Sequence, residues 1–222
     1  MLVLPGRAGE MDELRGQISR GVIVAVLAML GGCAAPQQIV DRSDFLAEGA
    51  REYPGESKER VIKAAETVLR ISDPTDFEFR YNLNGFEGLR RYTIYAVLAA
   101  AQGRERWDFV TESTPGVTRA SVSVSEAGVT TGGYTQQRYE NTMASIPLYR
   151  LFWSRVDYML GRRADWVTCE QAVAELEKSN TNTNAALGGL CGLTSDGRNA
   201  PAPEPLPPLA SQGRPVVAAK RK

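Results

Sequence analysis

The chain has 222 residues, carries 26 lysines and arginines against 26 aspartates and glutamates, and contains no histidine. The lack of histidine excludes Ser-His-Asp and Cys-His nucleophilic pairs and removes the commonest zinc ligand. The balanced charge gives no electrostatic reason to expect a nucleic acid partner.

A short apolar segment near the N-terminus ends at a cysteine. Residues 22–30 are uninterrupted apolar, Arg15 and Arg20 precede them, and Leu30-Gly31-Gly32-Cys33 closes the segment. It is shorter than the about 20 residues that cross a bilayer, but it has the length of the apolar core of a secretory signal. With its basic flank and its ending, the segment resembles the leader and lipobox of bacterial lipoproteins.

The resemblance implies a signal peptide over residues 1–32 and a mature chain that starts at a lipid-modified, palmitate-bearing Cys33. Several acyl chains would anchor the protein stably in a membrane. Ala34 follows in place of aspartate, which in Gram-negative sorting implies the periplasmic face of the outer membrane and leaves the inner membrane as the alternative. Two alternatives stay open. The segment could be an ordinary buried strand or helix that contains Cys33, and translation could start at Met11 in place of Met1.

The remainder of the chain divides into three parts by composition. Residues 33–54 have the composition of a lipidated N-terminus and tether, with one short helix between Asp41 and Arg51. Residues 55–194 hold the periodic apolar patterns of a folded periplasmic domain. Residues 195–222 are rich in proline and alanine, and we expect them to be disordered.

Within the domain, capping and turn residues separate a helix, a set of strands and two further helices. Ser57 caps the first helix, which ends at Asp73-Pro74. Alternation and turn residues then predict strands over 77–83, 91–99, 107–111 and 120–125, a weaker fifth over 133–139, and turns at Asn84-Gly85, Gln102-Gly103-Arg104 and Pro115-Gly116. Ser145 begins the second helix, and Thr168 and Gln171 form a capping box before the third. These elements predict an α+β fold: a two-layer domain in which an antiparallel four- to five-stranded meander packs against flanking helices.

Two cysteines remain if Cys33 carries lipid. Cys169 and Cys191 are an even pair in a chain expected to be exported, and the periplasm is kept oxidising, so we expect a disulfide between them. The alternative is two reduced, partly buried thiols.

Aromatic residues supply the candidate binding surfaces. Tyr149 and Trp153 widen the apolar stripe of the second helix beyond what one sheet face requires, so we predict a partner surface there; the alternative is that the stripe only covers the sheet. The strand aromatics either line an apolar cleft or form the core, and the alternation favours core. They are Phe77, Phe79, Tyr81, Tyr92, Tyr95, Trp107 and Phe109.

The acidic residues of the strands give little indication of catalysis. Nothing in the spacing of Glu78, Glu87, Asp108 and Glu112 makes them converge, and the alternative is a solvated face paired with Arg80, Arg90, Arg91 and Arg106. With no phosphate loop, dinucleotide fingerprint or metal-ligand spacing, we expect no catalytic residue, metal or cofactor. We therefore expect a non-enzymatic accessory or scaffold subunit of a cell-envelope complex, with an envelope protein as partner. The alternative is a carrier of a lipid or other small apolar ligand.

Overall fold

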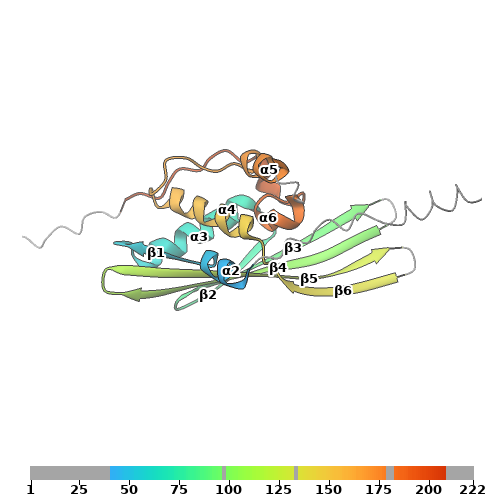
Figure 1. Cartoon of the computed structure of the whole chain (residues 1–222), viewed down its shortest axis with the longest axis horizontal. Coiled ribbons are helices and arrows are strands. Elements are labelled where there is room, and N and C mark those ends of the chain that lie inside the picture. The colour runs from blue at the N-terminus through green and yellow to red at the C-terminus, as the bar shows by residue number, and fades with distance from the viewer. Residues whose placement is uncertain (1–40, 97–98, 133–134, 179–182, 209–222) are drawn as a thin grey trace, which may run out of the picture. The chain divides into compact units, whose positions relative to one another are not determined.

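A single antiparallel sheet carries a layer of helices on one of its faces (Figure 1). The computed structural model describes residues 41–96, 99–132, 135–178 and 183–208. The strands are β1 (Ala50–Pro54), β2 (Phe77–Asn82), β3 (Gly85–Ala96), β4 (Ala99–Thr114), β5 (Val117–Gly132) and β6 (Thr135–Thr142). The helices are α2 (Arg42–Glu48), α3 (Lys58–Ser72), α4 (Ile146–Met159), α5 (Cys169–Lys178), α6 (Thr183–Cys191) and the short 3-10 helix η1 (Asp196–Asn199).

The sheet order is β1-β5-β4-β3-β2, and β6 also pairs with β5. Strands β2 to β6 follow one another as antiparallel neighbours, which confirms the α+β class and the predicted meander. The sheet has six strands rather than four or five, because β1 adds to β5 from a segment that we expected to be a tether. Its residue Ala50 lies opposite Ser121, and Pro54 lies opposite Val117.

Local signals explain where several elements begin and end. The Ser57 side chain accepts a hydrogen bond from the Arg60 amide at 3.3 Å, so α3 begins as predicted, and it ends at Asp73 before Pro74. The predicted capping box is also present before α5. The backbone amide of Gln171 donates to the Thr168 hydroxyl at 3.2 Å. The backbone amide of Thr168 donates to the side-chain oxygen of Gln171 at 3.0 Å.

One predicted turn is wrong. Gln102-Gly103-Arg104 lies inside β4, which runs without interruption from Ala99 to Thr114. Gly103 does not turn the chain; the ring of Tyr92 lies over it and fills the space that a side chain would take. A strand glycine can mark such a close approach as well as a turn. The second strand consequently ends earlier than predicted, because Ala99 already belongs to β4.

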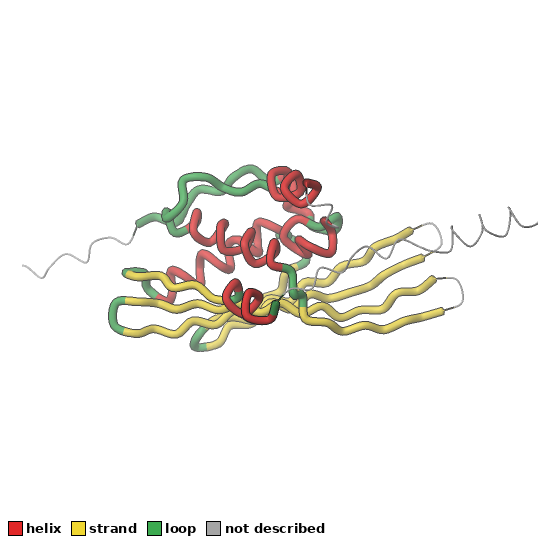
Figure 2. Tube along the Cα trace, viewed as in Figure 1, coloured by secondary structure: helices red, strands yellow, loops and turns green. Residues whose placement is uncertain are grey.

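The core forms between the sheet and the helices that cover it (Figure 2). Trp107 and Phe109 of β4 meet Phe152 of α4, with ring centroids 5.5 and 6.1 Å apart, respectively. Helix α3 contributes a buried stripe that includes Val61, Val68 and Leu69. All of these side chains are fully buried, so the helical layer is held against the middle of the sheet by aromatic and aliphatic packing.

The folded unit extends at both ends beyond the expected boundaries of 55 and 194. On the N-terminal side it includes α2 and β1. On the C-terminal side, we predicted disorder from residue 195, and this is wrong for residues 195–208. Residues 196–199 form η1, and residues after η1 are hydrogen-bonded to α4. The Leu206 amide donates to the Met159 carbonyl at 2.9 Å, and the Tyr158 hydroxyl donates to Pro203 at 2.8 Å. In the described part of the chain, no helix has the length and apolar character needed to cross a membrane.

Candidate functional site

The sheet is longer than the helical layer, and its outer end extends past the helices (Figure 2). We call this end the distal ribbon: residues 91–96 of β3, 99–104 of β4, 125–132 of β5 and 135–142 of β6. Helix α6 lies near the place where the ribbon leaves the helical layer (Figure 1). The ribbon combines exposed side chains with free strand edges, which are the two features that dock partners.

Two tyrosines and two glycines form a row across the base of the ribbon. The register places Tyr92, Gly103, Gly128 and Tyr139 side by side on β3, β4, β5 and β6. Each tyrosine ring lies over its neighbouring glycine, and the two hydroxyl groups are 2.9 Å apart. The Tyr92 hydroxyl also donates to the Glu126 carboxylate. Burial and these hydrogen bonds raise the pKa of Tyr92 far above its ordinary value, so the hydroxyl remains a donor.

Beyond this row, apolar side chains are exposed on both faces. Ile94 is 43% exposed on the face that carries the helices further along the sheet, and Tyr95 is 80% exposed on the opposite face. β2 pairs with β3 only from Gly85 to Arg90, so residues 91–96 form a free edge as far as the described strands show. On the other side of the ribbon, the described residues give β6 no second neighbouring strand.

The ribbon carries an excess of positive charge. Its residues include Arg91, Arg104 and Arg138 against Glu140 and the half-buried Glu126, which Tyr92 already engages. Arg91 and Arg104 lie directly opposite one another on neighbouring strands, an arrangement of like charges that costs free energy. Glu78 of β2 approaches Arg91 to 2.7 Å and offsets part of this repulsion.

A buried ion cluster lies beside the tyrosine row, on the same face of the sheet and one residue pair nearer the helical layer. Arg90 is fully buried; its Nε donates to Asp73 at 2.6 Å, and its Nη1 lies 3.3 Å from Glu105. The Glu105 carboxylate also accepts from the Gly189 amide at 2.8 Å, and Arg90 reaches the Thr194 carbonyl at 2.5 Å. Burial raises the pKa of the Glu105 carboxyl, although Arg90 opposes the shift. The cluster ties α3, β3, β4 and the α6 region together.

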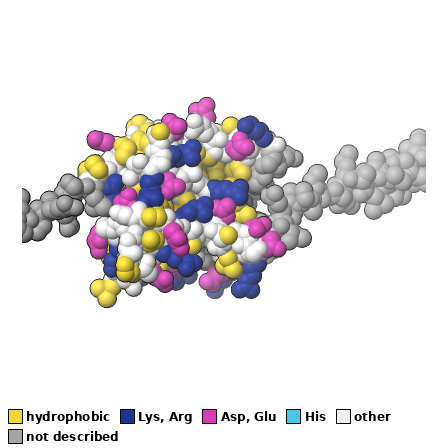
Figure 3. Space-filling model, turned by 60° about the vertical axis from the view of Figure 1, so that its left-hand side comes forward, with side chains coloured by type: hydrophobic (Ala, Val, Ile, Leu, Met, Phe, Trp, Pro, Cys, Tyr) yellow, Lys and Arg dark blue, Asp and Glu magenta, His cyan; other side chains and the backbone are white. Residues whose placement is uncertain are grey.

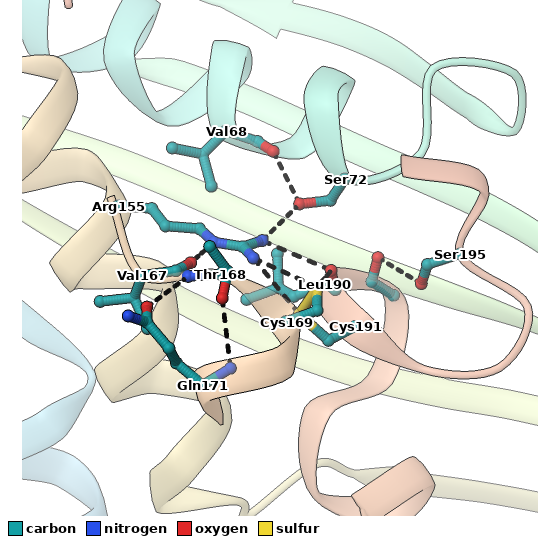
Figure 4. Close-up of a disulfide and its surroundings, with 11 residues drawn as sticks. Val68, Ser72, Arg155, Val167, Thr168, Cys169, Gln171, Leu190, Cys191 and Ser195 are labelled. Atoms are coloured by element: carbon teal, nitrogen blue, oxygen red, sulfur yellow. Dashed lines mark hydrogen bonds between the residues drawn. A yellow bond between two sulfur atoms is a disulfide. The ribbon is translucent and has the colours of Figure 1, made fainter. Parts of the chain in front are cut away.

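A second buried arginine lies against the disulfide (Figure 4). Cys169 and Cys191 are joined, with Cα atoms 5.3 Å apart, so the predicted disulfide is confirmed. The Nη2 of Arg155 lies 3.3 Å from each sulfur, and its Nη1 donates to the Ser72 hydroxyl at 3.1 Å. The guanidinium also stacks 4.7 Å from the Trp166 ring. Burial lowers the pKa of Arg155 to about 10. This group therefore links α3, α4, α5 and α6 from the inside.

The predicted partner surface at Tyr149 and Trp153 is wrong, since each side chain is only 1% exposed. Helix α2 covers this side of α4: the Trp153 indole donates to the Glu48 carbonyl at 2.7 Å, and the Phe45 ring packs edge-on against Tyr149 at 5.2 Å. The stripe of α4 is wide because it is covered twice, by the sheet and by α2. The alternative that the stripe covers the sheet holds for the side of α4 that bears Phe152.

The strand aromatics divide between core and surface. Phe77, Trp107 and Phe109 are buried, as the core interpretation predicts, whereas Tyr81 and Tyr95 are exposed. Tyr95 is the aromatic residue that sequence reasoning failed to single out. Its signal was present in the sequence, because it lies in an apolar run flanked by Arg91 and Arg104.

The candidate carboxylates mostly pair with arginines on the exposed sheet. Glu87 lies 3.6 Å from Arg80 and 3.1 Å from Arg106, and Asp108 lies 3.1 Å from Arg106. Arg90 is the exception to the predicted surface pairing, because it is buried in the ion cluster. Glu112 lines a depression of about 220 Å³ on the sheet face away from the helices, with Val110, Arg119 and Ser121. Across the described residues, no three histidine, cysteine, aspartate or glutamate side chains are grouped to hold a metal.

Residues Leu30-Gly31-Gly32-Cys33 lie outside the described residues, so lipidation and cleavage there stay predictions.

Basic and acidic side chains are intermixed on the face that Figure 3 presents. Comparison of the chain with protein-family models, with curated protein sequences and with solved structures finds no match.

Proposed function

We propose that this protein is a membrane-anchored periplasmic lipoprotein that acts as a non-enzymatic accessory or scaffold subunit of a cell-envelope complex. The observation that carries the proposal is the distal ribbon, in which β6 pairs with β5 and, among the described residues, has no second neighbouring strand. A free edge accepts a partner strand through main-chain hydrogen bonds. The ribbon replaces Tyr149 and Trp153 as the proposed contact surface.

The lipobox and the disulfide support the anchored, exported location. Leu30-Gly31-Gly32-Cys33 has the residue types that lipoprotein processing needs, and the Cys169–Cys191 bond is of the kind that persists in oxidising compartments. Ala34 after the cysteine, in place of aspartate, supports the outer membrane, facing the periplasm, as the location. The inner membrane is the alternative.

The packing favours a scaffold over a carrier of an apolar ligand. A carrier needs an open apolar cavity between sheet and helices, on the order of 300 Å³ or more. That space holds Trp107, Phe109 and Phe152, which are fully buried against one another. The buried charged groups Arg90 and Arg155 are likewise engaged by neighbouring protein groups, which supports a structural use for them.

Intact mass spectrometry tests the anchoring directly. The full chain with a C-terminal tag is expressed in a Gram-negative host and purified from membranes in detergent. We expect a mass that begins at Cys33 and includes acyl chains, and a Cys33→Ser variant that lacks them. A wild-type chain that keeps the residues before Cys33 and carries no acyl group would refute the lipoprotein assignment.

Site-specific photocrosslinking in cells tests the scaffold role. A photoreactive residue is placed at Gln137, exposed on the edge strand β6, and a matched one at Glu170, exposed on α5. We expect a discrete crosslinked envelope protein from position 137 and none from position 170. The same products from both positions, or none from either, would contradict docking through the ribbon.

A further inference from the structure

We infer that the tip of the distal ribbon, formed by Ile94, Tyr95, Ala99, Ala100 and Ala101, contacts the interfacial region of an anionic phospholipid bilayer. The inference rests on the proposed function, because it uses the lipid anchor at Cys33 to bring the ribbon to the membrane. It adds a second, protein-made contact to that anchor.

The tip exposes apolar side chains on both faces of the sheet. Ile94 and Ala99 belong to one face, and Tyr95 belongs to the other. A docked protein strand covers an edge, and a docked protein surface covers one face. A bilayer surrounds whatever enters it, so it is the partner that covers both faces at once.

The charges around the tip complement anionic headgroups. No charged residue occurs in the sequence between Arg91 and Arg104, and these two lie opposite one another about 13 Å from the Tyr95–Ala100 pair. Arg138 and Glu140 are exposed on the same face as Arg104, and Glu78 pairs with Arg91 at 2.7 Å, so three arginines on this face stand against two carboxylates. Arginines next to an apolar segment are attracted to the anionic surface of a membrane, and this attraction would add to the offset that Glu78 already gives to Arg91.

The free edge limits how deeply the tip enters. Beyond the end of β2, no described strand pairs with the outer edge of β3 at residues 91–96, and such an edge is not tolerated in the hydrocarbon core. At the interface, water and headgroups satisfy these groups, and tyrosine is enriched there. The contact is therefore interfacial and does not span the bilayer.

Fluorescence quenching by brominated lipid tests the inference on the full chain, purified from membranes and reconstituted in vesicles of phosphatidylethanolamine and phosphatidylglycerol. The native tryptophans are buried and give the background. Probes are Tyr95→Trp and Ala99→Trp, one on each face, and the matched control is Tyr81→Trp, an exposed position about 30 Å from the tip along the sheet. We expect both probes to shift to shorter wavelengths and to lose emission as brominated lipid increases, and the control to do neither.

Two results would overturn the inference. One is that both probes are quenched no more than Tyr81→Trp. The other combines two measurements: the amides of residues 91–96 gain protection from hydrogen exchange only when a co-purified protein is present, and the emission of the probes does not respond to brominated lipid. That result would identify a protein strand as the partner. Intact mass of the same sample reports acylation at Cys33 separately. An acylated chain without quenching therefore overturns the tip contact alone and leaves the lipoprotein assignment standing.

Discussion

The hydroxyl groups of Tyr92 on β3 and Tyr139 on β6 lie 2.9 Å apart. The two strands between them, β4 and β5, each have a glycine at this position. The two rings take the space that side chains at Gly103 and Gly128 would occupy. An aromatic ring over a strand glycine shields backbone that would otherwise be exposed and helps to fix the register. This row therefore joins all four strands of the ribbon at the point where helical cover ends.

Replacement of Gly128 by alanine should loosen the ribbon. A Cβ atom there would lie 2.5 Å from the Gln102 carbonyl oxygen and 2.6 Å from the Tyr139 hydroxyl oxygen, so both the ring and the backbone of β4 have to shift. We expect a loss of about 1–3 kcal/mol in the free energy of unfolding, as is typical of overpacking. Chemical denaturation measures the loss, and hydrogen exchange should show faster exchange in β6.

Gly132→Ala is the matched control for this prediction. It lies on the same strand, and an added Cβ would meet only the Ala99 Cβ, at 4.0 Å. We expect its free energy of unfolding to stay within about 0.5 kcal/mol of the wild type. Equal losses in the two variants would mean that the tyrosine rings do not depend on the glycines.

Removal of the disulfide should destabilise the domain and loosen α5 and α6 first. The bond joins residues separated by 22 positions, and closing a loop of that length contributes about 3 kcal/mol by restricting the unfolded chain. We expect that loss in a Cys169→Ser, Cys191→Ser double variant. Denaturation with and without a thiol reductant measures it, and the reductant should change the wild type but not the variant. An equal response of both to the reductant would contradict the assignment.

Much of the fold could be predicted from the sequence, because the signals were local. The Ser57 cap, the capping box at Thr168 and Gln171, and the strand alternation each depend on side chains within a few residues of one another. The errors arose where a distant segment decides the outcome. Gly103 resembled a turn because the ring that covers it belongs to Tyr92, on another strand.

The wrong partner surface has the same physical origin. The wide apolar stripe of α4 was correctly detected, but its second cover, α2, lies about a hundred residues earlier in the chain. Residues 33–54 have the composition of a tether, and five of them become a strand only because β5 offers an edge there. The exposed tip at Tyr95 was missed because alternation with apolar residues on both faces is also typical of a central strand.

Trp153→Ala should test this correction. The side chain is buried, packs 5.0 Å from Phe152 and donates to the Glu48 carbonyl, so truncation should cost about 3–5 kcal/mol in the free energy of unfolding. Tyr95→Ala, at an exposed position, should cost no more than about 0.5 kcal/mol. Thermal and chemical denaturation compare the two. A small loss for Trp153→Ala would restore it as a surface residue.

The Glu105 carboxyl should make stability depend on pH with a definite sign. Burial raises its pKa above that of the unfolded chain, against the pull of Arg90 and with a smaller raising contribution from Glu126. The folded state therefore holds the proton more tightly. The stability that this group contributes is complete below the unfolded pKa, near 4.5, and is lost as pH rises through the folded pKa.

Glu105→Gln isolates that contribution, because glutamine keeps the shape of the side chain but does not titrate. We expect the free energy of unfolding of the variant, relative to the wild type, to increase as pH rises from about 4 to 7. Denaturant titrations at several pH values measure the difference, and circular dichroism at the lowest pH checks that both chains are folded. A relative stability that falls with rising pH would mean that the ion pair with Arg90 outweighs the cost of burying the carboxylate.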